Sequence, residues 1–148
     1  MKKSTAKATA NFVPSAVITA IQAGYIHALE VTADDELEGR GPTRASVKET
    51  YQVCREFAIA NSADVLRAID MGMGIDDVGI NLFQTSQGHG TGFWDRKLEL
   101  FNCAGDPDEL KSEFAEIMGR LTEASKKFAN VEFWPSSVEG KYCFQYHK

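Results

Sequence analysis

The chain has 148 residues, which is long enough for one domain built around a single hydrophobic core. Its 43% hydrophobic and 25% charged residues exclude wholesale disorder. The net charge of -5 argues against a general affinity for nucleic acid, because such binding rests on Lys and Arg side chains that neutralise phosphates. No apolar stretch has the length of a membrane span, so we expect no membrane association.

The N-terminal part of the chain predicts a tail, a helix and an acidic loop. Residues 1–12 are mostly small or basic and predict a disordered tail, followed by a single α+β domain over residues 13–148. Apolar residues at spacings of three and four predict a helix over residues 14–31. Residues 32–42 combine acidic side chains with two glycines and a proline, which predicts a loop.

Two further helices are predicted next. Ser46 with Glu49 three residues later is typical of a capping box, and the apolar positions that follow favour a helix ending near Asn61. Ser62 is a candidate cap for a short third helix, which ends at a Met-Gly repeat.

The second half of the chain predicts strands and one long helix. Residues 79–86 hold a short apolar run bounded by glycines, which predicts a strand with residues 91–95 as its hairpin partner. A helix is predicted over residues 107–128, where an Asp-Pro pair is typical of a helix start. Residues 131–134 and 142–146 flank a turn sequence and predict a second hairpin.

These elements predict an α+β fold, with N-terminal helices followed by a ββαββ unit. The strands would form a small antiparallel sheet, and a sheet needs a helix to bury its apolar face. We expect the long helix over residues 107–128 to cover it, since that helix carries the clearest apolar stripe in the chain.

The most unusual stretch is QGHGTGFWDR, residues 87–96. Glycines at alternate positions leave one face of an extended chain bare and permit the positive φ angles of a tight turn. We expect them to serve geometry, by turning the chain and delivering the aromatic pair to buried positions. The residues expected to have this structural role are Gly88, Gly90, Gly92, Phe93, Trp94 and Asp95.

His89 is the candidate catalytic group in this stretch. An exposed imidazole between glycines can transfer a proton, and Asp95 is a candidate to orient it. A lone histidine in a glycine-rich turn is more often a polar turn residue, so we assign no catalytic residue. The stretch lacks the sequence context of a phosphate-binding loop, and we predict no cofactor.

The three cysteines are far apart and odd in number. No Cys-x-x-Cys pair or Cys/His spacing of a zinc site occurs, so we predict no metal. We expect reduced, mostly packed thiols in a cytoplasmic protein. The cysteines are Cys54, Cys103 and Cys143.

Two segments are candidates for binding a partner. The tip of the expected turn is one, and the acidic loop is the other, because an acidic surface can occupy the basic groove of another protein. The candidate partner-binding residues are Gln87, His89, Thr91 and Arg96 in the turn and Asp34, Asp35 and Glu36 in the loop.

The glycine-rich stretch resembles the signature of a family of small tailed-bacteriophage proteins. Thr85, then residues 88–90, then residues 92–96 are similar to the pattern T-x-x-G-H-G-x-G-F-W-D-R of that family. The likeness extends more loosely from Tyr25 to the C-terminus, and Ser86 with Gln87 stands where the family has Arg and Asn. The resemblance implies a phage origin and action in the cytoplasm of a bacterial host. It implies no activity, because the family has none assigned.

We therefore expect a non-enzymatic phage accessory protein that binds a host protein in host takeover or counter-defence, by analogy with its class of gene. A nucleic-acid-binding protein is the first alternative, using Arg96, Lys97, the basic tail and the aromatic residues of the sheet. A small hydrolase or nuclease that uses His89 and Asp95 is the second. The sequence gives no prediction of the oligomeric state.

Overall fold

The structure, a computed structural model, describes residues 12–98 and 104–148 and shows an α+β fold. The helices are α2 (Ser15–Thr32), α3 (Asp34–Leu37), α4 (Arg44–Ala60), α5 (Ser62–Asp70), α6 (Ile75–Ser86) and α7 (Pro107–Ser125). Two 3-10 turns, η1 (Phe93–Asp95) and η3 (Lys126–Phe128), and three strands, β1 (Gly41–Pro42), β2 (Val131–Pro135) and β3 (Lys141–Tyr146), complete the described chain. The expected basic tail, apart from Phe12, and Cys103 lie outside the described residues.

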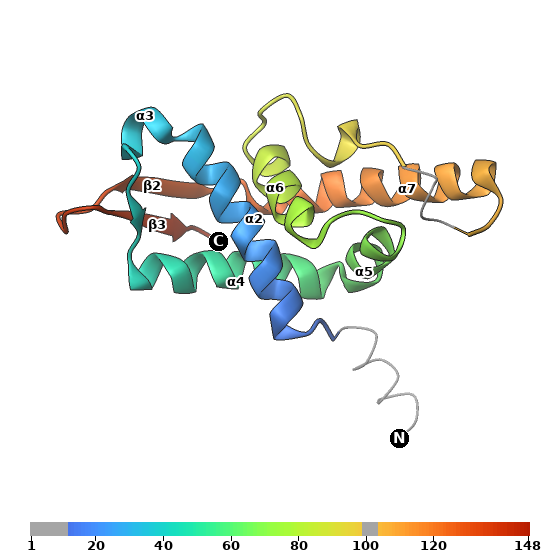
Figure 1. Ribbon diagram of the computed structural model, residues 1–148, viewed down its shortest axis with the longest axis horizontal. Coiled ribbons are helices and arrows are strands. Elements are labelled where there is room, and N and C mark those ends of the chain that lie inside the picture. Colours follow the sequence, from blue (N-terminus) through green and yellow to red (C-terminus); the bar gives the residue numbers. More distant parts are fainter. Residues whose placement is uncertain (1–11, 99–103) are drawn as a thin grey trace, which may run out of the picture.

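Helices α2 and α6 pack backbone against backbone at the centre of the fold. A Cβ added to Gly24 of α2 would lie 1.8 Å from the carbonyl oxygen of Asp76. A Cβ added to Gly79 of α6 would lie 1.7 Å from the carbonyl oxygen of Ile21. Only glycine at both positions lets the two helices come this close. In Figure 1, α2 crosses the molecule beside α6, with the hairpin β2–β3 on one side and α5 and α7 on the other.

The predicted strand over residues 79–86 is wrong, because these residues form the C-terminal part of α6. The buried positions Val78, Leu82 and Ser86 recur every four residues, the spacing of a helix face. Gly79 marks the contact with α2 and not the edge of a strand. The predicted partner strand over residues 91–95 is also wrong, since it is a loop that ends in η1.

The predicted C-terminal hairpin is confirmed, and it belongs to a mixed sheet. β2 pairs antiparallel with β3, with Phe133 opposite Phe144. β1 pairs in parallel with the other edge of β3, which gives the strand order β1-β3-β2. A strand of two residues carries no periodic signal, so the sequence could not reveal β1. The ββαββ unit is therefore replaced by helices around one hairpin and one short parallel strand.

Ser46 joins α4 to the edge of β3 and does not cap the helix as predicted. Thr43 is the N-cap, and its hydroxyl accepts from the backbone N–H of Ser46 at 3.1 Å. The buried hydroxyl of Ser46 accepts from the backbone N–H of Phe144 at 2.7 Å and donates to the carbonyl of Tyr142 at 3.4 Å. The side chain thus continues the hydrogen bonding of β3 at the point where β1 ends.

The cover of the sheet differs from the prediction. Helix α7 begins behind the N-cap Asp106, as expected, but it packs against α5, α6 and η1. The helix that lies against β3 is α4, as Figure 1 shows below the hairpin. The chain reverses from β1 directly into α4, and this short connection places α4 beside the sheet.

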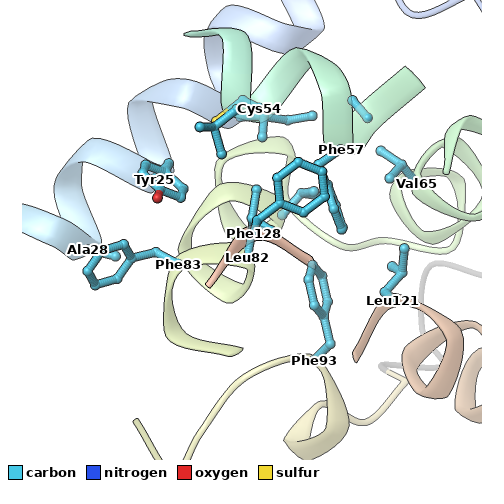
Figure 2. Packing of buried hydrophobic residues seen from close by; sticks show 14 of the residues in the cluster. Tyr25, Ala28, Cys54, Phe57, Val65, Leu82, Phe83, Phe93, Leu121 and Phe128 are labelled. Carbon is cyan, nitrogen blue, oxygen red and sulfur yellow. The ribbon is translucent and has the colours of Figure 1, made fainter. Parts of the chain in front are cut away.

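Aromatic rings from several elements meet in the core. Phe57 of α4 stacks on Phe93 of η1, with ring centroids 5.9 Å apart. Tyr25 of α2 meets Phe83 of α6 edge to face at 5.3 Å. Figure 2 shows Phe93 reaching from its turn towards Phe57 and the neighbouring helices. The loop before η1 is therefore anchored to the core by the aromatic residue that follows its last glycine.

Candidate functional site

The glycine-rich stretch forms a loop that leaves the C-terminus of α6 and returns through η1 to α7. The N–H groups of Gly88 and His89 donate to the carbonyls of Thr85 and Gln84, which closes the last turn of α6. Gly88 and Gly90 have φ angles of 68° and 77°, in the left-handed region that favours glycine. The turn expected at these glycines is present, although it follows a helix and not a strand.

The hydroxyl of Thr85 holds the second half of the loop. It accepts from the backbone N–H of Phe93 at 3.0 Å. Gly92 lies directly against the same side chain, where a Cβ would meet the hydroxyl oxygen. Thr85, in the last turn of α6, and Gly92, directly before η1, are thus in contact.

The two neighbouring aromatic residues point in different directions. Phe93 is fully buried against Phe57, as expected. Trp94 is 56% exposed, so the expectation that it is buried is wrong. The two residues lie in a 3-10 turn, where successive side chains diverge around the axis, and only one of them can face the core. Trp94 is left as a large aromatic side chain on the surface of an anchored loop.

A polar network ties the loop back to α6. The Thr91 hydroxyl donates to Asp95 at 3.1 Å and accepts from the guanidinium of Arg96 at 3.2 Å. Arg96 also donates through Nε to Asn81 at 2.8 Å and through Nη2 to Gln84 at 3.4 Å. Thr91, Asp95 and Arg96 therefore fix the shape of the loop, and no ion pair joins Asp95 to Arg96.

The arrangement does not assemble a catalytic pair around His89. The imidazole is exposed and stacks on Phe83, with ring centroids 5.6 Å apart and an interplanar angle of 22°. No hydrogen bond joins it to Asp95, whose carboxylate accepts from Thr91. A histidine that acts as a general base is commonly oriented by a hydrogen bond to a carboxylate. The described loop offers stacking and packing in place of that geometry.

Gln87 has a structural contact that its place in the sequence does not suggest. Its side-chain amide donates to the carbonyl of Ala129 at 3.1 Å, beyond the end of η3. This bond links the start of the loop to the segment that leads into β2. Of the four partner-binding candidates in the turn, Gln87, Thr91 and Arg96 are thus engaged within the protein, while His89 keeps its outer ring face on the surface.

The acidic candidates lie elsewhere in the molecule. Asp34, Asp35 and Glu36 form the first turn of the short helix α3, which replaces part of the predicted loop. Figure 1 places α3 on the other side of α2 from the loop that follows α6. A cavity of about 360 Å³ lies beside α3 and includes Glu30, whose carboxylate accepts from the Tyr142 hydroxyl at 2.9 Å. The two predicted partner-binding segments are therefore separate surfaces.

The sheet does not present an aromatic face that could stack on bases. Tyr142 and Phe144 are buried, and Phe133 and Tyr146 pack against the core. Trp134 is the exposed aromatic side chain of the hairpin, at 41%. The aromatic alternation that suggested nucleic-acid binding is explained by the inner face of the hairpin.

A groove that the sequence did not reveal lies between the segment after η1 and α7. We call it the basic groove; its volume is about 380 Å³. Its lining combines three cationic side chains with three apolar ones. The lining residues are Arg96, Lys97, Leu98, Lys111, Phe114 and Ala115. Helical spacing places Lys111, Phe114 and Ala115 on one side of α7, but nothing in the sequence shows which segment packs against that side.

No group of three His, Cys, Asp or Glu side chains is placed to hold a metal ion within residues 12–98 and 104–148. Within the same ranges, no helix combines the length and the apolar character of a transmembrane segment. Searches of protein-family models, of curated protein sequences and of solved structures found no match to this chain.

Proposed function

We propose that this protein binds a host protein and that the loop after α6 supplies the contact surface. The observation that carries the proposal is the exposure of Trp94, at 56%, on a loop that Phe93 and Thr85 anchor to the core. Tryptophan is enriched among the residues that contribute most to binding at protein interfaces. His89 lies on the same loop, where its ring stacks on Phe83.

The polar contacts within the loop support a binding role over an enzymatic one. Thr91, Asp95 and Arg96 satisfy one another or side chains of α6. A catalytic group must instead be free to act on a substrate, and it usually carries an orienting partner. The proposal therefore assigns no catalytic residue, and it treats these polar groups as the scaffold that holds Trp94.

The sequence resemblance supports the biological setting of the proposal. A small tailed-phage protein acts in the cytoplasm of a bacterial host, and host takeover or counter-defence requires contact with a host protein. Contact with a host protein requires no enzymatic activity of the loop. The setting is proposed on the residues of the signature, Thr85, residues 88–90 and residues 92–96.

Capture from a bacterial lysate by the tagged protein tests the proposal. Trp94→Ala should lose the captured protein, and Trp134→Ala is the matched control because it removes a second exposed tryptophan from the hairpin. Both variants should melt close to the unchanged protein, since neither side chain is buried. Each capture is repeated after nuclease treatment.

Equal capture by the Trp94→Ala and unchanged proteins would contradict the proposed surface. Loss of all capture after nuclease treatment would instead favour the nucleic-acid-binding alternative. A protein retained through nuclease treatment, lost in Trp94→Ala and kept in Trp134→Ala is the expected result.

A further inference from the structure

The basic groove differs from the neighbouring contact between α5 and α7, where the cations are paired. Arg67 of α5 meets Glu113 of α7 at 2.8 Å, and Arg120 of α7 meets Asp64 of α5 at 2.9 Å. No carboxylate in the described part of the chain lies within ion-pair distance of Lys97 or Lys111. These two lysines therefore carry positive charge that no described partner neutralises.

Arg96 adds a third positive charge to the groove. Its guanidinium donates to Asn81, Gln84 and Thr91, which are all neutral acceptors. These bonds fix the position of the guanidinium without cancelling its charge. A fixed cation loses little side-chain entropy when an anion binds, which favours binding over the pairing of two mobile side chains.

The lining between the cations is apolar. Leu98 lies on one wall, and Phe114 and Ala115 of α7 lie on the other. A volume of about 380 Å³ is at the lower end of the range for binding pockets, about 300–1,000 Å³. A space of this size and lining suits one large apolar side chain with anionic groups on either side of it.

We infer that the basic groove binds a short acidic segment of the partner protein that carries one large apolar side chain. The apolar side chain enters between Leu98 and Phe114, and carboxylates before and after it pair with Lys97 and Lys111. This inference rests on the proposed function and names the chemistry of its partner. It also extends the contact surface from Trp94 along the chain to residues 96–98.

Charges around the groove favour such a segment over a nucleic acid. Asp95 is exposed immediately before Arg96. Asp108 lies three residues before Lys111 on α7, and Glu109 lies in the same first turn. A phosphate backbone carries a charge at every nucleotide and would meet these carboxylates along its length, whereas a short segment with two carboxylates places both of them beside the lysines.

Selection from a random dodecapeptide library on the immobilised protein tests the inference. Enriched peptides should share a large apolar residue flanked by Asp or Glu. One enriched peptide is then synthesised with a fluorescent label, and its affinity is measured by anisotropy. Lys111→Glu should weaken this binding by about tenfold or more, because it places a carboxylate opposite the peptide's own. Lys48→Glu makes the same charge change on the exposed face of α4 and should leave binding within about twofold.

Three outcomes would overturn the inference: enrichment of no peptide or of peptides without acidic residues, unchanged binding by Lys111→Glu, or tighter binding of an oligothymidine DNA than of the peptide. Melting curves of Lys111→Glu and Lys48→Glu check that both variants fold. Both lysines are exposed, so neither substitution should change the melting temperature. Lysate capture that depends on Trp94 but persists in Lys111→Glu would reject the groove and leave the proposed function standing. If Trp94→Ala and Lys111→Glu both still capture the protein, the groove and the proposed function are both rejected.

Discussion

A Cβ added to Gly92 would lie 2.1 Å from Oγ1 of Thr85, the same oxygen that accepts from the N–H of Phe93. The contact joins the last turn of α6 to the residue before η1. The contact explains why the signature has a threonine at position 85 and a glycine at position 92. The Thr85 hydroxyl binds the backbone of Phe93, and Gly92 leaves room for that hydroxyl. The third position, Phe93, is thereby directed into the core.

Gly92→Ala should destabilise the protein more than Gly90→Ala. Alanine at Gly92 is strained in two ways. The φ of 155° is one that residues with a side chain rarely adopt, and the added methyl meets Thr85, whose movement breaks its bond to Phe93. We therefore expect a loss of about 2–4 kcal/mol in the free energy of unfolding. Gly90 has nothing within 4 Å of an added Cβ, and its φ of 77° alone should cost about 1 kcal/mol. Urea unfolding of both variants makes the comparison. Equal losses would show that backbone strain accounts for both variants and that the contact with Thr85 adds nothing.

Phe93→Ala should destabilise the protein far more than Trp94→Ala. Truncation of the fully buried Phe93 removes its stacking on Phe57 and should cost about 3–5 kcal/mol. Truncation of the exposed Trp94 should cost less than about 1 kcal/mol. Thermal melts of the two variants test this directly. A larger loss from Trp94→Ala would place its ring in the core and remove the basis of the proposed contact surface.

The sequence predicted the elements whose signals are local. The first helix, the end of α4 near Asn61, the start of α7 behind Asp106 and the C-terminal hairpin all appear where capping residues, apolar stripes or turn residues indicated them. Each of these signals acts within a few residues of the element that it marks. The α+β class follows from them.

The errors arose where contacts between distant residues decide the structure. Gly79 resembles a strand boundary in the sequence, and only the approach of α2 explains it. Ser46 resembles a helix cap in the sequence, whereas its hydroxyl accepts a hydrogen bond from the backbone of Phe144, on a strand near the other end of the chain. Trp94 was expected to be buried with Phe93 because the glycines were expected to deliver both aromatic residues to packing positions, whereas η1 turns only Phe93 into the core. The basic groove needs two segments to meet, which no local pattern encodes.

Gly79→Ala should destabilise the protein although alanine is the better helix former. The methyl would lie 1.7 Å from the carbonyl oxygen of Ile21, which belongs to the backbone and cannot rotate away. Forcing α2 and α6 apart should cost about 3 kcal/mol or more. Gly119→Ala is the matched control, because Gly119 is exposed on α7 with nothing within 4 Å of an added Cβ. It should stabilise the protein by about 0.5–1 kcal/mol. Loss of stability in both variants would point to a cause other than helix contact.

Cys54 should make the stability of the protein depend on pH in the alkaline range. Complete burial raises the pKa of its thiol well above the ordinary value of about 8.5. Below that pH both the folded and the unfolded chain keep the proton, so the contribution is constant. Above it the unfolded chain releases the proton and the folded chain does not. The unfolded chain then binds fewer protons, and the free energy of unfolding falls as the pH rises.

Urea unfolding of the unchanged protein and of Cys54→Ala at about pH 7.5 and about pH 9.5 measures this contribution. From the lower to the higher pH, ionisation of Cys54 in the unfolded chain should lower the free energy of unfolding of the unchanged protein by about 1.4 kcal/mol. Cys54→Ala should not show this decrease. Tyr25 has the same sign, because burial raises the pKa of its hydroxyl, but its effect begins only near pH 10 and stays outside the window. The variant has a lower stability at both pH values, since it loses the packing of the sulfur. The prediction concerns the difference between the two pH values, and an equal loss in both proteins would show that the thiol ionises without unfolding.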